Sequence, residues 1–267
     1  MVLKIRPVAL IFLFAILVPG IVNGNPLLDE IAEGEGTSDD IAAEKGFASG
    51  YDVPLAYGAY GKPSVPLTEM TIKDVQDFQD LIIENQIKEG ILPKDASGAV
   101  GKYQITKTTL QGLLNKPELE LTVDSPFNAE TQEKLAQALL EERGYVNWLN
   151  GKDPNPDNSL DANAEFQDKL AWEWASIADP LTGKGKYPTQ PNARTSTEEI
   201  KDAMTQTKLV ISDTTIAPID PTAPVDSGDQ YEAYRIDEAF IYYSQGIILA
   251  SSGKHDEAIQ AFYEAIR

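Results

Sequence analysis

The amino-acid sequence predicts an α+β fold that is mostly helical, with a small β-hairpin or sheet near its start and a C-terminal α-hairpin. Three observations favour this fold. Apolar residues recur at helical spacing behind capping residues over 25–208, a Gly-, Pro- and aromatic-rich segment interrupts them at 46–67, and a Pro/Thr/Asp-rich stretch at 209–230 precedes another helical segment. With 267 residues, one medium domain and an appendage are expected.

The first 24 residues have the pattern of a signal peptide. Lys4 and Arg6 precede an apolar run over 8–18, and the small-residue stretch that ends at Gly24 suits cleavage. We therefore expect an exported protein, periplasmic or extracellular, with the leader cleaved near Gly24. An uncleaved N-terminal anchor is the alternative, although the run is short for a membrane span.

Several helices are marked by their caps. Asn25 and Pro26 open the first helix, and Thr71 starts another that continues to about Glu89. Asn128 caps a helix that ends at Gly144, and Thr197 starts a further one. In the helix capped by Asn128, the predicted inward-facing residues are Leu135, Leu139 and Leu140. An additional helix stops before Pro180, and its predicted inward-facing residues are Phe166, Leu170, Trp174 and Ile177.

The segment GFASGYDVPLAYGAYGKPSVPL, residues 46–67, cannot propagate a helix because glycines and prolines alternate with aromatic residues. This composition predicts a short irregular β-hairpin or small sheet.

The last 37 residues, 231–267, resemble one tetratricopeptide repeat that follows a semi-extended linker at 209–230. A single repeat cannot bury its own apolar face. We expect it to pack on the first domain, on a second copy or on another protein, unless the sequence is part of a longer chain. The residues that match the repeat pattern are Tyr242, Gly246, Leu249, Gly253, Ala258, Phe262 and Ala265.

Composition excludes several kinds of chemistry. The formal charge of −20 becomes −22 when Lys4 and Arg6 leave with the leader, which argues against nucleic acid and anionic membranes as direct partners. His255 is the one histidine and cysteine is absent, so zinc catalysis and Cys/His nucleophiles have almost no ligands. Catalysis would depend on carboxylates, hydroxyls or lysine, and no cofactor or metal is expected.

The stretch EIAEGEGTSDD contains two candidate catalytic glutamates. Glu35 continues the apolar stripe of the first helix at i+7 from Leu28, whereas Glu33 points away from it. Burial and the negative end of the helix dipole would both raise the pKa of Glu35, as a general acid near neutral pH requires. The alternative is that Glu35 is an ordinary helix-terminal surface residue.

Five segments then suggest a family: IAEGEGTSDD, GFASGYDV, SGAVGKYQI, FNAETQEKLAQALLEERG and EWASIADPLTGKGKY occur in this order. Together they resemble the lysozyme-like peptidoglycan glycosidases of the lambda-type phage endolysin group and their bacterial muramidase relatives. The resemblance covers about residues 27–190. It implies a lysozyme-like domain over 25–208 in which the glutamate of the EGT motif, Glu35 here, is the general acid.

The resemblance also implies other site residues. Asp52 of GYDV is a candidate second catalytic carboxylate, although relatives can carry asparagine there and a turn-forming role is the alternative. The residues expected to bind substrate are Thr37, Tyr51, Tyr103 and Gln104. Gln104 could instead help to orient Glu35. The alternative for Tyr103 is an ordinary core aromatic. Tyr57 and Tyr60 could stack on sugars. The family's Y-G-Q segment reads YPTQ here, residues 187–190.

The resemblance implies cleavage of the β-1,4 bond between N-acetylmuramic acid and N-acetylglucosamine in peptidoglycan. Two outcomes stay open: hydrolysis, as in a muramidase, or attack by the muramic 6-hydroxyl, as in a lytic transglycosylase. A non-catalytic wall-binding scaffold that acts through the C-terminal repeat is the rival from another class.

Overall fold

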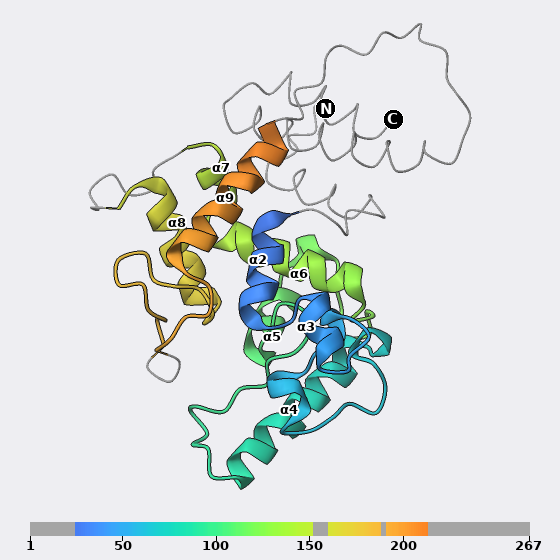
Figure 1. Ribbon diagram of the computed structural model, residues 1–267. Helices are drawn as coiled ribbons and strands as arrows, with labels where there is room; N and C mark the ends of the chain where they lie inside the picture. The colour runs from blue at the N-terminus through green and yellow to red at the C-terminus, as the bar shows by residue number, and fades with distance from the viewer. Residues whose placement is uncertain (1–24, 152–159, 188–190, 213–267) are drawn as a thin grey trace, which may run out of the picture.

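A computed structural model describes residues 25–151, 160–187 and 191–212 (Figure 1). The predicted leader, most of the predicted linker and the whole tetratricopeptide-like segment lie outside these residues. Within the described part, the chain is mostly α-helical and contains no named β-strand. None of its helices is both long and apolar enough to cross a lipid bilayer.

The described α-helices are α2 (Pro26–Glu35), α3 (Asp39–Glu44), α4 (Ile72–Lys88), α5 (Lys107–Leu114), α6 (Ala129–Glu142), α7 (Tyr145–Leu149), α8 (Ala162–Glu173) and α9 (Thr197–Ser212). Short 3₁₀ helices connect them: η1 (Gly50–Asp52), η2 (Leu55–Gly58), η3 (Leu67–Glu69) and η4 (Pro117–Leu119). A mostly helical domain is therefore confirmed.

The predicted caps explain where these helices begin. The Asn25 side chain accepts a hydrogen bond from Leu27 N at 3.1 Å, and Pro26 occupies the first helical position. Thr71 and Asp74 form a reciprocal capping box, and Asn128 accepts from Thr131 N at 2.9 Å. Because each cap satisfies backbone donors that the helix itself leaves unpaired, these boundaries are encoded locally.

Helix α2 packs along α9, which lies some 170 residues later in the sequence (Figure 1). Leu27 N, which the Asn25 side chain caps, also donates to Thr207 Oγ1 of α9 at 3.1 Å, so the start of α2 is tied to α9. Helix α9 continues to Ser212, four residues into the segment predicted to be a linker. The core beneath these helices includes Leu27, Ile31, Ile72, Ile82, Leu110, Leu135, Leu140, Phe166, Leu170 and Ile200.

The predicted β-hairpin over 46–67 does not form. This segment contains η1 and η2, and its β-pairing is reduced to a single bridge between Pro54 and Val100. Ala56 and Tyr57 both adopt positive φ, 48° and 55°, so the chain coils tightly instead of extending. Prolines remove the donors that a strand ladder needs, and this explains why an aromatic-rich segment did not become a hairpin.

The helix predicted to reach Ile177 is shorter than expected. Helix α8 ends at Glu173, and Trp174 has extended dihedral angles of −112° and 115°. Phe166, Leu170, Trp174 and Ile177 are all buried as predicted, but Ile177 lies beyond the helix and pairs with Thr195 in a parallel bridge. Pairing with a distant segment has replaced the last helical turn.

Candidate functional site

Glu35 is the last residue of α2. Leu28, Ile31 and Ala32 of the predicted stripe are buried, Glu33 is exposed, and Glu35 is partly buried. Gly36 follows in the left-handed conformation with φ of 75°, and its N–H bonds back to the helix. The sequence therefore predicted the helix end and the different environments of the two glutamates correctly.

The Glu35 carboxylate faces the segment that follows α8. Ser176 Oγ donates a hydrogen bond to Glu35 Oε1 at 2.6 Å, and Ser176 N lies 3.3 Å from the same oxygen. Arg194 Nη1 donates to the backbone carbonyl of Glu35 at 3.2 Å. Residues 141 and 159 positions later in the chain thus surround the end of α2 with polar groups.

Burial raises the pKa of the Glu35 carboxyl above its ordinary value of 4.5. The two hydrogen bonds from Ser176 and the charge of Arg194 oppose part of this rise, because they stabilise the ionised form. The direction agrees with the expectation from the inward stripe. A carboxyl group shifted in this way can hold its proton at higher pH than a surface glutamate does.

Two glycines let other segments approach Glu35 closely. A Cβ atom on Gly34 would lie 2.1 Å from Thr195 Oγ1, and one on Gly36 would lie 2.6 Å from the Tyr57 hydroxyl. The Tyr57 hydroxyl donates to the Gly36 carbonyl at 3.1 Å. Glycine is therefore needed on each side of Glu35, because the side chains of Thr195 and Tyr57 occupy the space that a Cβ atom would take.

Thr37 is buried beside the C-terminal end of α2. Its side chain is 1% exposed, and its hydroxyl contacts the carbonyl oxygens of Ala32, at 3.1 Å, and of Lys102. A Cβ on Gly50 would lie 1.9 Å from the Thr37 carbonyl oxygen. In this structure Thr37 joins the end of α2 to two loops and presents almost no surface to a ligand.

Both carboxylate oxygens of Asp52 accept hydrogen bonds, from Ser49 beside it in the chain and from Thr68 of η3. Oδ1 accepts from Thr68 N at 3.0 Å and from Thr68 Oγ1 at 2.8 Å, and Oδ2 accepts from Ser49 Oγ at 3.2 Å. The residue is 8% exposed. These contacts favour the turn-forming role over the role of second catalytic carboxylate.

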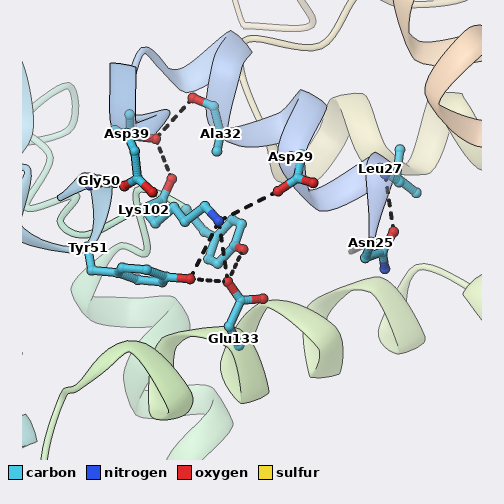
Figure 2. A network of polar contacts seen from close by, with 11 residues as sticks. Asn25, Leu27, Asp29, Ala32, Asp39, Gly50, Tyr51, Lys102 and Glu133 are labelled. Atoms are coloured by element: carbon cyan, nitrogen blue, oxygen red, sulfur yellow. Dashed lines mark hydrogen bonds and ion pairs between the residues drawn. The ribbon is translucent and has the colours of Figure 1, made fainter. Parts of the chain in front are cut away.

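The hydroxyls of Tyr51 and Tyr103 both contact Glu133 of α6. Figure 2 shows Tyr51 and Lys102 beside Glu133. The two tyrosine hydroxyls donate to Glu133 Oε1 at 2.6 and 2.5 Å, and Lys102 Nζ lies 3.5 Å from that oxygen and 3.6 Å from Asp29 Oδ1. Burial first, and then the Glu133 carboxylate, raise the pKa of both tyrosines. Tyr51 and Tyr103 are 7% and 1% exposed, so their rings belong to the core.

Gln104 stabilises the turn that carries it. Its amide nitrogen donates to the carbonyls of Gly101, at 2.9 Å, and of Val53, at 3.2 Å, and its own φ is 46°. The side-chain amide therefore closes the loop between Val100 and Ile105, and its hydrogen bonds go to Gly101 and Val53 and not to Glu35.

Sequence reasoning missed Ser176, Arg194, Lys102 and Glu133. Ser176, Lys102 and Glu133 lie within segments that carried the family resemblance, but nothing in their spacing indicated polar contacts with residues far away in sequence. Arg194 had no such signal. The group formed by Glu35, Ser176 and Arg194 exists only because the chain returns to α2 after α8.

Comparisons with known proteins leave the family open. A scan against protein-family models and searches of curated proteins and of solved structures found no match to this chain. Within the described residues, no group of three or more His, Cys, Asp or Glu residues is arranged to hold a metal ion.

Proposed function

We propose that this protein is an exported peptidoglycan glycosidase in which Glu35 is the general acid. The observation that carries the proposal is the environment of Glu35: a partly buried carboxyl with a raised pKa, at the end of a capped helix and held by Ser176. The order of the lysozyme-like segments supports the substrate, the β-1,4 bond between N-acetylmuramic acid and N-acetylglucosamine. The lysozyme-like fold is part of this proposal.

In the reaction, the Glu35 proton moves to the glycosidic oxygen while the bond from that oxygen to C1 of muramic acid breaks. The electron pair of this bond stays on the leaving oxygen, and a cationic sugar centre forms. Glu35, now ionised, then takes a proton from the attacking hydroxyl group. This hydroxyl belongs either to water or to C6 of the same muramic acid.

The contacts of Asp52 bear on whether a second carboxylate takes part in the reaction. A retaining hydrolase uses a second carboxylate as nucleophile, but both Asp52 oxygens already accept hydrogen bonds from Ser49 and Thr68. This supports a reaction with one carboxylate, in which the muramic 6-hydroxyl or a water molecule attacks. Attack by the 6-hydroxyl would make the enzyme a lytic transglycosylase.

The test is digestion of purified peptidoglycan by the wild type, Glu35→Gln and Glu33→Gln, with products identified by mass spectrometry. We expect the wild type and Glu33→Gln to release the same fragments and Glu35→Gln to release none. Ends with a 1,6-anhydro ring would identify a transglycosylase, and reducing ends a hydrolase.

Activity that survives Glu35→Gln would exclude Glu35 as the acid. A wild type that binds peptidoglycan and releases nothing would instead favour the scaffold function, with the C-terminal repeat as the protein-binding element.

A further inference from the structure

The two oxygens of the Glu35 carboxyl have different surroundings. Oε1 receives both donors of Ser176, from Oγ at 2.6 Å and from N at 3.3 Å. Among the described residues, Oε2 has no hydrogen-bond or ion-pair partner. Glu35 as a whole is partly buried. Its carboxyl group is thus anchored through one oxygen, and the other oxygen has no such partner among the described residues.

This asymmetry determines where a proton is held. A protonated carboxyl has one carbonyl oxygen, which accepts hydrogen bonds, and one hydroxyl, which donates. Since Ser176 supplies donors to Oε1, it favours Oε1 as the carbonyl and leaves the proton on Oε2.

We propose that Ser176 is a positioning residue that directs the transferable proton of Glu35 to Oε2, the oxygen that faces the substrate. This inference rests on the proposed glycosidase function. In the transfer, the bond between Oε2 and its proton breaks, the proton joins the glycosidic oxygen, and Oε1 keeps its bonds to Ser176. Because Oε1 stays bound to the same donors before and after transfer, the carboxyl group need not rotate.

Ser176 is itself held firmly enough for this role. It is 5% exposed, and its carbonyl accepts from the backbone N–H groups of Arg194 and Thr195, both at 2.9 Å. The next residue, Ile177, forms the bridge to Thr195. The backbone around Ser176 is therefore fixed by pairing that does not involve its hydroxyl, and removal of the hydroxyl should leave this pairing intact.

Among the described residues, few charged or titratable groups lie close to the carboxyl. Arg194 contributes a positive charge from the segment before α9, Tyr57 contributes a hydroxyl from η2, and Glu33 on α2 is exposed and directed away. A change in the titration of Glu35 after substitution of Ser176 can then be assigned to the lost hydrogen bond.

The experiment compares Ser176→Ala with the wild type in two measurements. The first is the dependence of kcat and KM on pH with peptidoglycan fragments as substrate. The second is a ¹³C NMR titration of the Glu35 carboxyl in the absence of substrate, assigned with Glu35→Gln. Ser38→Ala is the matched control, because the Ser38 hydroxyl is buried and has no hydrogen-bond partner in the described residues.

For Ser176→Ala we expect kcat to fall about tenfold with KM nearly unchanged, since misorientation of an acid affects the reaction more than binding. The alkaline limb of the kcat profile and the Glu35 titration should both move to higher pH, because the ionised form has lost a donor. Ser38→Ala should match the wild type in both. Ser176→Cys, which keeps a weaker donor, should titrate between the wild type and Ser176→Ala.

If the wild type is active and Ser176→Ala has the same titration and pH profile as the wild type, the proposed role of Ser176 is overturned and the proposed glycosidase function stands. A wild type that releases no product would overturn the proposed function, and the NMR titration would still show whether the hydrogen bond to Glu35 exists. The two failures are therefore distinguishable.

Discussion

Lys102 Nζ and Glu133 Oε1 lie 3.5 Å apart where α2, η1, the 100–105 turn and α6 meet (Figure 2). The Lys102 side chain is 11% exposed and that of Glu133 is 18% exposed. The ammonium also lies 5.0 Å from the centre of the Tyr51 ring and 5.5 Å from that of Tyr103. The Glu133 carboxylate thus joins α6 to η1 and to the 100–105 turn, and Lys102 extends the network to Asp29 in the first turn of α2.

Replacement of Glu133 by glutamine should destabilise the protein. Lys102 would lose the charge of Glu133 in a poorly hydrated environment and keep only Asp29, at 3.6 Å, as a negatively charged partner. We therefore expect the free energy of unfolding to fall by about 2–3 kcal/mol. The measurement is urea unfolding of Glu133→Gln. Glu84→Gln is the control, because the Lys88–Glu84 pair is exposed, and its free energy of unfolding should change by less than about 0.5 kcal/mol. Equal effects in the two variants would contradict this interpretation.

Gly34 should not tolerate a side chain. An added Cβ would lie 2.1 Å from Thr195 Oγ1 and 3.1 Å from Ser176 Oγ, so Gly34→Ala should cost about 1–3 kcal/mol of stability and disturb Glu35. Gly112→Ala in α5 is the matched control, because nothing lies within 4 Å of its Cβ position. That variant should gain about 0.5–1 kcal/mol from helix propensity. Thermal unfolding measures both, and a stabilised Gly34→Ala would show that the close approach is absent.

Asp52→Asn should keep most of the activity on peptidoglycan. The asparagine carbonyl oxygen can still accept from Thr68 N, which preserves the loop, whereas Asp52→Ala removes every acceptor and should cost about 1–2 kcal/mol. Initial rates and unfolding midpoints of both variants provide the measurement. A loss of activity of about a thousandfold in a stable Asp52→Asn protein would restore Asp52 as a catalytic carboxylate.

Glu35→Gln should increase stability at neutral pH. Because the folded-state pKa of Glu35 is raised, the native state binds more protons than the unfolded state above the ordinary value of 4.5. The contribution of Glu35 to stability is therefore present below that value and is lost as pH rises through the folded-state pKa, with a slope of at most about 1.4 kcal/mol per pH unit. Glutamine removes this loss and keeps an acceptor for Ser176.

The difference in unfolding free energy between Glu35→Gln and the wild type should thus grow from about pH 4.5 upwards and then level off. Glu33→Gln, at an exposed position, should show no such growth. A constant difference between the Glu35→Gln and wild-type proteins across this range would mean that the Glu35 carboxyl is not desolvated.

The helices were largely predictable because their signals are local. Asn25, Thr71 and Asn128 cap the helices that the sequence assigned to them, and the stripe from Leu28 to Glu35 separates Glu35 from Glu33. Capping and periodicity depend on residues a few positions apart, so a linear sequence contains all the information that they need.

The contacts of Glu35 were decided by the tertiary structure. Ser176 reaches the carboxylate only because α8 ends early and the chain pairs with Thr195, and Asp52 is occupied because Thr68 folds back onto it. The 46–67 segment shows the same limit, since its composition suited a strand while its prolines and positive φ angles produced 3₁₀ turns. The sequence alone determined which carboxylate lies at the inward end of α2, because helical geometry is local. Only the fold decided which hydroxyl holds it, because that contact spans 141 residues.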